Sequence, residues 1–261
     1  MIAAAFVGGL ILHYTDTSDS LGIGLINIGL VYLFMLVMVI PHELGHAIAA
    51  RIVGFRVFKV VIGYGPILLT RKYLGWQWEF RPLPIGGVTV AASPLPRLYR
   101  TREFLLVLAG PLVNVIFAVA PFWLGQKIGS SNRLGFWEAS LLIDLALANI
   151  LLLVMNLWPR KLPTTTGIID SDGLALLTVP FSSQKTVEEG LATYYRLASN
   201  ELLRRNQFGQ AIQQCEQGLV HFPDSEPLRK QMGLVLLVMN EIDKTRQLGR
   251  KQKSIAPVPD P

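Results

Sequence analysis

The sequence predicts an α-helical polytopic membrane protein with a membrane-associated β-hairpin and a small C-terminal all-α helical-repeat module. Hydrophobic residues make up 51% of the 261 residues and charged residues only 16%, whereas soluble domains average about 25% charged residues. Several apolar runs are long enough to cross a bilayer, which takes about 20 helical residues. From Ser182 onward the sequence becomes polar, which indicates a smaller soluble part after a membrane-embedded core.

These changes in composition set the expected domain boundaries. We expect a membrane core over residues 1–181, a soluble helical module over 182–253 and a disordered tail over 254–261. The expected spans lie at about residues 1–13, 21–50, 104–126 and 136–158. The first of these is short, but it lacks the basic start and the small-residue cleavage site of a signal peptide.

The net charge of +6 is better explained by membrane topology than by nucleic-acid binding. Nine basic residues lie from Arg51 to Arg102, and such clusters mark the cytoplasmic side of a membrane protein. We therefore expect a multi-pass protein of the cell membrane, with the lipid bilayer as partner and the C-terminal module in the cytoplasm. The single cysteine, Cys215, excludes an intrachain disulfide and a cysteine-rich metal site; a small buried apolar residue is its expected role.

The second expected span carries the strongest motif. The pattern His-Glu-x-x-His at residues 42–46 follows the apolar run 21–40. Residues four apart share one face of a helix, so His42 and His46 can offer ring nitrogens to one zinc ion. Glu43 can then act as general base on the attacking water, whose pKa zinc lowers from about 16 to about 7. Two surface histidines beside an ordinary acid are the alternative, but ionisable groups at a membrane-length segment are usually functional.

A His-Glu-x-x-His motif on a membrane helix resembles the site-2 protease family of intramembrane zinc metalloproteases. The resemblance covers about residues 21–180. It implies a zinc-dependent endopeptidase that hydrolyses peptide bonds in or next to transmembrane segments of membrane-protein substrates. A helical substrate hides its amides in its own hydrogen bonds, so local unwinding must precede attack.

Residues 54–93 predict the membrane-associated β-hairpin. Aromatic and polar residues alternate over 76–81, as in a half-buried strand, and an open strand edge cannot be satisfied in hydrocarbon. The segment is either an amphipathic surface hairpin or a strand that pairs with an unwound substrate. The site-2 protease family has such a hairpin, often with a Gly-Gly turn, which the run 85–88 resembles.

The third expected span, 104–126, contains Gly110 and Asn114. Gly110 is explained by helix packing alone, but a polar amide within a span normally has a partner. The site-2 protease family carries a Gly-x-x-x-Asn pattern in this helix. The resemblance therefore implies that Asn114 helps to orient the substrate or the developing oxyanion.

A catalytic zinc site normally has three protein ligands and one open position, so two histidines require a further ligand, here a carboxylate. The site-2 protease family supplies an Asp-Gly pair after an Asn-x-x-Pro element, which residues 156–159 resemble. The resemblance thus implies Asp172, which a glycine follows, as the third ligand. The loop between the two elements is longer here than is usual in the family, so Asp170 stays open as a rival. Asp144, a carboxylate inside the last span, is a weaker one.

The C-terminal module resembles a tetratricopeptide repeat, in which Ala211, Cys215 and Pro223 fall at the repeat's small, large and closing positions. A second copy would begin near Glu226 with a degraded second helix. Arrays of this kind need about three or more repeats to be stable. The module is therefore expected to pack on itself, on the membrane core or on a protein partner.

Two other functions stay open. One is a protease-like membrane scaffold without catalysis, whose helical repeat recruits partners; it would tolerate the loss of Glu43. The other is a metal transporter, which would line a continuous path with residues such as Asp144. The motif spacing favours hydrolysis, because transport needs weaker sites in series.

Overall fold

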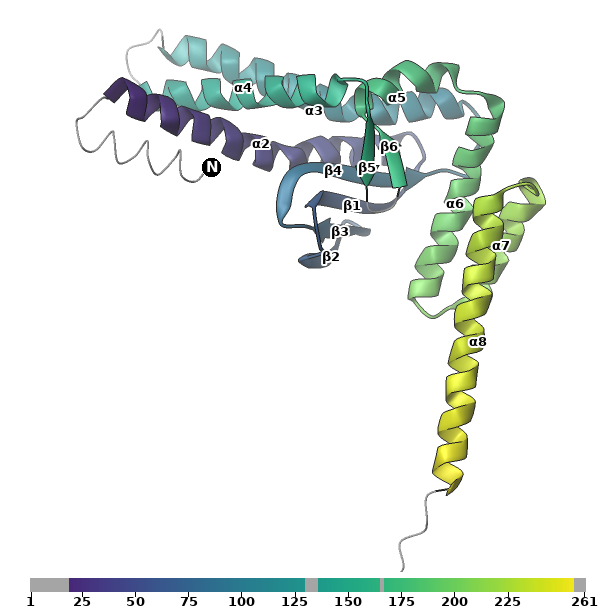
Figure 1. The fold of residues 1–261 in the computed structure, drawn as a ribbon. Coiled ribbons are helices and arrows are strands. Elements are labelled where there is room, and N and C mark those ends of the chain that lie inside the picture. Colours follow the sequence, from purple (N-terminus) through teal and green to yellow (C-terminus); the bar gives the residue numbers. More distant parts are fainter. Residues whose placement is uncertain (1–18, 130–135, 165–166, 256–261) are drawn as a thin grey trace, which may run out of the picture. The chain divides into compact units, whose positions relative to one another are not determined.

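The computed structural model describes residues 19–129, 136–164 and 167–255 (Figure 1). The expected first span and the end of the chain beyond Ile255 lie outside these residues. The chain divides into two compact units. The first comprises the chain up to Ala91 together with residues 98–182, and the second comprises residues 92–97 and the chain from Ser183 onward.

Three packed helices form the framework of the first unit. They are α2 (Asp19–Ile52), α3 (Tyr99–Gly129) and α4 (Phe136–Leu157). Apolar stretches long enough to cross a membrane lie at Gly24–Ile52 and Tyr99–Leu124, and a shorter one lies at Leu141–Leu157. Helices thus occupy the three described positions where spans are expected. The number of membrane crossings stays a prediction.

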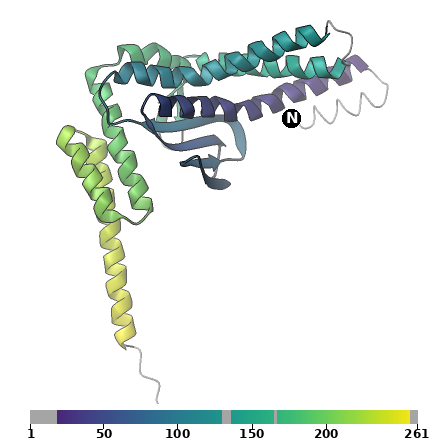
Figure 2. The same cartoon turned by 180° about the vertical axis from the view of Figure 1, so that it is seen from behind.

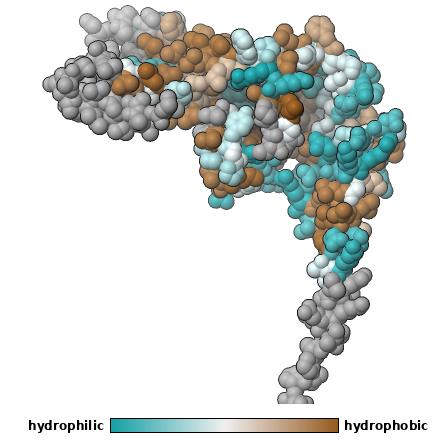
Figure 3. Space-filling view, viewed as in Figure 1, coloured by the Kyte–Doolittle hydropathy of each residue, from teal (hydrophilic) through white to brown (hydrophobic). Residues whose placement is uncertain are grey.

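Many apolar side chains on the outer surfaces of these helices are exposed. Leu33, Ile116 and Val154 are 52%, 61% and 58% exposed, and apolar side chains gather over the helical layer in Figure 3. Gly45 lets α2 approach α3 closely, because a Cβ there would lie 2.7 Å from the Val113 side chain. Small residues at such contacts are typical of membrane helices.

Residues 54–93, where a β-hairpin is expected, form a small four-stranded sheet. Its strands are β1 (Arg56–Tyr64), β2 (Leu69–Tyr73), β3 (Trp76–Phe80) and β4 (Leu83–Ala92). Their order is β2-β3-β1-β4, with β1 parallel to β3 and β2 antiparallel to β3. The region contains a hairpin, because β2 and β3 pair antiparallel across a two-residue turn. The sheet is larger than expected because β1 pairs with the other side of β3. The run 85–88, expected as the Gly-Gly turn, instead lies within strand β4.

A second, two-stranded element follows α4. Strands β5 (Lys161–Thr164) and β6 (Gly167–Asp170) pair antiparallel, with Leu162 opposite Ile169. Helix α5 (Asp172–Thr178) and the 3-10 helix η1 (Val179–Phe181) come next. The extra length of the loop before Asp172 is therefore used to form a β-hairpin.

The second unit contains three helices, α6 (Gln184–Arg204), α7 (Phe208–His221) and α8 (Glu226–Ile255), which lie side by side in Figure 2. Ala211 and Cys215 of α7 are fully buried, which confirms the packing role expected for Cys215. Helix α8 continues without a break where a second repeat would need a turn. The assignment to tetratricopeptide repeats stays a prediction.

Candidate metal centre

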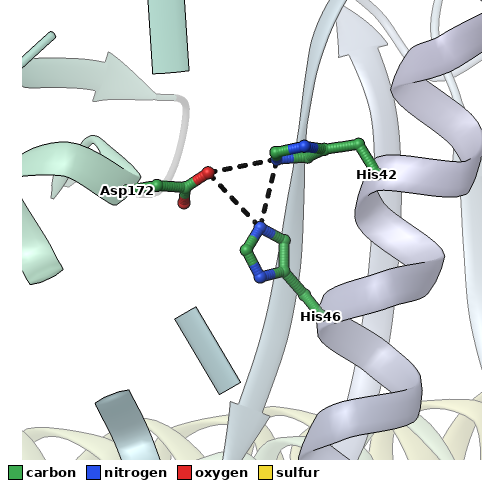
Figure 4. A group of neighbouring side chains, drawn as sticks. All are labelled: His42, His46 and Asp172. Atoms are coloured by element: carbon green, nitrogen blue, oxygen red, sulfur yellow. Dashed lines mark hydrogen bonds and ion pairs between the residues drawn. The ribbon is translucent and has the colours of Figure 1, made fainter. Parts of the chain in front are cut away.

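Three potential metal ligands converge in the first unit (Figure 4). His42 Nε2 lies 3.1 Å from Asp172 Oδ2 and 3.1 Å from His46 Nε2, and His46 Nε2 lies 3.5 Å from the same carboxylate oxygen. Both histidines are buried, and the Asp172 side chain is 21% exposed. Two imidazole nitrogens and one carboxylate oxygen form a ligand set that zinc accepts, with a position left for water or substrate.

The elements around this group explain why the side chains meet. The four-residue spacing in α2 puts both imidazole rings on one face of the helix. Gly110 of α3 leaves room for them, because a Cβ there would lie 2.8 Å from His42 Cε1 and even closer to the His46 ring. Gly173 packs directly on the backbone of Leu157, where a Cβ would clash with the carbonyl group. This contact ties the start of α5 to the end of α4.

Ser171, the residue before Asp172, is held by hydrogen bonds of its side chain. Its hydroxyl donates to the Trp158 carbonyl at 2.9 Å and accepts from the backbone amides of Arg160 and Leu174 at 3.1 and 3.4 Å. The same side chain therefore caps α5 and closes the base of the β5–β6 hairpin. Asp172 is the first residue of the helix, so its position is set by this cap.

Each histidine has a partner on its second ring nitrogen. His42 Nδ1 lies 2.5 Å from Asn114 Oδ1, and His46 Nδ1 donates to the Leu106 carbonyl at 2.9 Å. Such partners orient metal-binding histidines and leave Nε2 for the metal. A carboxylate binds a metal in its ionised form.

Glu43 is buried beside the ligand group and is held by β4. The Thr89 hydroxyl donates to Glu43 Oε2 at 2.7 Å and lies 3.0 Å from the Glu43 backbone oxygen. Gly87 leaves space for the carboxylate, because a Cβ there would lie 2.7 Å from Glu43 Oε1. Sequence reasoning missed the contact of Thr89 with Glu43, because the two residues are 46 apart and no local pattern pairs them.

The structure separates the candidate carboxylates. Asp170, two residues before Asp172, is exposed and pairs with Lys161 in the hairpin. Asp144 is buried in α4. Within the described part of the chain, neither belongs to the group formed by the two histidines and Asp172.

Asn114 lies behind His42. It is 0% exposed, contacts the histidine ring, and is absent from the lining of the neighbouring cavity. The substrate contact expected for Asn114 therefore finds no support in this geometry. Asn156 instead lines the cavity, with its Nδ2 atom 3.4 Å from His42 Nε2.

A cavity of about 270 Å³ opens beside the ligand group. Its lining combines the ligands with Glu43, with the segment from Gly86 to Thr89 of β4, and with Leu162 and Ile169 of the hairpin. A base, a potential metal site and apolar side chains of the hairpin thus border one space. This arrangement suits hydrolysis of a bond held in an extended, partly apolar chain.

The chain matches one protein-family profile and parts of several curated proteins. The profile of Peptidase family M50 matches residues 30–244. The Regulator of sigma E protease of Haemophilus influenzae is 30% identical over 112 residues, which cover 37% of this chain and 25% of that protein. The Membrane metalloprotease ARASP, chloroplastic, of Arabidopsis thaliana is 35% identical over 96 residues, 32% of this chain and 22% of that protein.

A Neisseria meningitidis protein named as a candidate zinc metalloprotease is 32% identical over 108 residues, 36% of this chain and 24% of that protein. The chain thus matches about a quarter of the length of these curated relatives. The relative's name agrees with the ligand set, so zinc is the metal that the centre fits. The family match covers most of the chain, agrees with the resemblance to site-2 proteases, and establishes that this chain belongs to peptidase family M50.

Proposed function

We propose that this chain is an intramembrane zinc endopeptidase that cleaves peptide bonds in or next to transmembrane segments of membrane proteins. The observation that carries the proposal is the single cavity shared by Glu43 and the ligand group. The apolar outer surfaces of α2, α3 and α4 support a location within the bilayer. The relatives named as membrane metalloprotease and as sigma E regulator protease support the same class of activity.

In this proposal His42, His46 and Asp172 hold the zinc ion. When bound, zinc supplies Lewis-acid chemistry, which polarises a carbonyl group and acidifies water. Glu43 takes a proton from the water that attacks the peptide carbonyl and later gives it to the leaving nitrogen. Thr89 keeps the Glu43 carboxylate in place through its 2.7 Å hydrogen bond.

The substrate enters the cavity as an extended stretch of chain. Strand β4 has β1 as its only neighbour among the described strands of its sheet, so its other edge can pair with an unwound substrate. Leu162 and Ile169 of the β5–β6 hairpin also line the cavity and offer apolar contacts. A substrate with apolar side chains near the cleaved bond fits this lining.

Topology and partners form part of the same proposal. Nine basic residues from Arg51 to Arg102 support a cytoplasmic position for the sheet side of the core. We place α6, α7 and α8 in the cytoplasm as a module that binds a protein partner. The protein would cross the membrane more than once.

The test uses the full chain purified in mild detergent, with zinc counted per chain and cleavage of a transmembrane peptide followed. Glu43→Gln should keep zinc and lose cleavage, because it removes only the base. Asp172→Asn should lose zinc, whereas Asp170→Asn, its matched control two residues away, should not. A well-folded wild-type protein that contains no zinc would contradict the proposal. Full cleavage by Glu43→Gln would exclude the assigned base, and partner binding without any cleavage would favour the scaffold function.

A further inference from the structure

A second asparagine is connected to the metal centre through Asn114. Asn149 of α4 is 0% exposed and lies 35 residues from Asn114 in the sequence. Its Nδ2 atom donates to the Leu145 carbonyl at 2.8 Å, and its Oδ1 atom accepts from Asn114 Nδ2 at 3.0 Å. Asn114 Oδ1 in turn lies 2.5 Å from His42 Nδ1. Two buried amides thus join the backbone of α4 to a metal ligand on α2.

The Leu145 carbonyl, at the end of this series, determines the direction of every hydrogen bond in it. A backbone carbonyl only accepts hydrogen bonds, so Asn149 must turn its NH₂ group toward Leu145. The side-chain oxygen of Asn149 then faces Asn114, so Asn114 must donate a hydrogen bond from its NH₂ group. The oxygen of Asn114 is left for His42, and because an amide oxygen only accepts, Nδ1 of His42 must carry the hydrogen. With Asn114 turned over, two amide oxygens would face each other without a hydrogen between them.

The consequence appears on the other side of the ring. A neutral imidazole with its hydrogen on Nδ1 has its lone pair on Nε2, and His42 Nε2 is the atom that faces Asp172 and His46. His46 also has its hydrogen on Nδ1, because this atom donates directly to the Leu106 carbonyl. Both rings are therefore held in the tautomer that can bind a metal.

We propose that Asn149 is a positioning residue for the zinc ligand His42, acting through Asn114. This inference depends on the metal site of the proposed function. A polar residue that only joined two helices would need a partner but no particular orientation. Here a backbone carbonyl sets the orientation of Asn149, and the orientation is passed to the ligand. Residues of this kind typically change metal affinity by about 10–100-fold when they are lost.

The first experiment measures zinc affinity of the full chain in mild detergent by competition with a chelator. Asn149→Leu, which keeps the volume and removes the hydrogen bonds, should weaken zinc binding by about 10–100-fold. The double variant with Asn114→Leu should bind no more weakly than Asn114→Leu alone, because both changes break one series. Wild-type affinity in a folded Asn149→Leu protein, or additive losses in the double variant, would overturn the proposal.

A second measurement needs only the wild-type protein and its four histidines. In the zinc-loaded protein with ¹⁵N-labelled histidine, nuclear magnetic resonance should show a hydrogen on His42 Nδ1 and the metal on Nε2. His46, which Leu106 holds, is the internal control. In Asn149→Leu, exchange of the Nδ1 hydrogen with water should rise for His42 and stay constant for His46. Metal on His42 Nδ1 in the wild type would refute the inference, whereas a folded wild type that binds no zinc would refute the metal site itself.

Discussion

At the scale of single residues, the absence of a side chain at position 110 decides whether two imidazole rings fit against α3. We predict that Gly110→Ala abolishes zinc binding while the helix content stays the same. The added Cβ would lie 2.8 Å from His42 Cε1 and closer still to the His46 ring, so the rings must leave their positions. Zinc content and circular dichroism of the purified protein measure both effects.

Gly24→Ala is the matched control, because a Cβ there meets nothing within 4 Å. Alanine in a helix is more stable than glycine by about 0.5–1 kcal/mol, so this variant should keep zinc and be at least as stable as wild type. Equal zinc content in both variants would mean that the rings lie elsewhere.

Thr89 is the second residue whose role depends on one contact. We predict that Thr89→Val lowers the rate of cleavage by about 10–100-fold, since a hydrogen bond to a charged group contributes about 1.5–3 kcal/mol. Zinc content should not change, because the hydroxyl contacts Glu43 and none of the ligands. Thr89→Ser, which keeps the hydroxyl, should restore most of the rate. A comparison of the rate constant at saturating substrate with zinc content tests this, and a loss of zinc in Thr89→Val would contradict it.

At the scale of elements, one serine connects the end of α4, the β5–β6 hairpin and α5. We predict that Ser171→Ala destabilises this region by about 1–2 kcal/mol, because it removes the helix cap and the bonds to Trp158 and Arg160. Hydrogen exchange in residues 161–164 and 167–170 should become faster.

Ser183→Ala is the control for this prediction. Ser183 caps α6 by accepting from the Thr186 amide at 3.1 Å, and it belongs to the second unit, whereas the hairpin belongs to the first. Its loss should therefore leave exchange in β5 and β6 unchanged. If both variants loosened the hairpin equally, the assigned role of Ser171 would be wrong.

At the scale of the whole molecule, the two units should respond differently to loss of the metal. The only cysteine lies in the second unit, where Cys215 is 0% exposed and its thiol donates to Ser199 Oγ at 3.2 Å. Burial raises the pKa of this thiol, so little reactive thiolate forms near neutral pH. We predict that a maleimide labels Cys215 only when denaturant unfolds α6, α7 and α8.

Removal of zinc by a chelator should leave this protection intact, because all three ligands belong to the first unit. Labelling of Cys215 with and without chelator, followed against denaturant concentration, measures the outcome. Faster labelling after metal removal would show that the two units unfold together.

Local patterns in the sequence were enough to predict the helical framework and the core of the motif. Apolar runs over residues 21–50, 104–126 and 136–158 correspond to helices because both hydrophobicity and helix geometry act over neighbouring residues. The four-residue spacing of His42 and His46 likewise needs only one helix. The zinc cofactor and the family follow from that motif, and both are confirmed by the comparisons.

Contacts between distant segments were decided only by the tertiary structure. The β2–β3 hairpin became part of a four-stranded sheet because β1 pairs with β3, although the paired residues are 18 apart in the sequence. The resemblance favours Asp172 because a glycine follows it but leaves Asp170 open, whereas packing of Gly173 on Leu157 holds Asp172 beside the histidines. Asn114 faces His42 because Asn149 lies behind it. The contacts among Asn149, Asn114, Asp172 and the histidines depend on the close packing of α2, α3 and α4. The spacing of residues within one segment does not predict how separate helices pack.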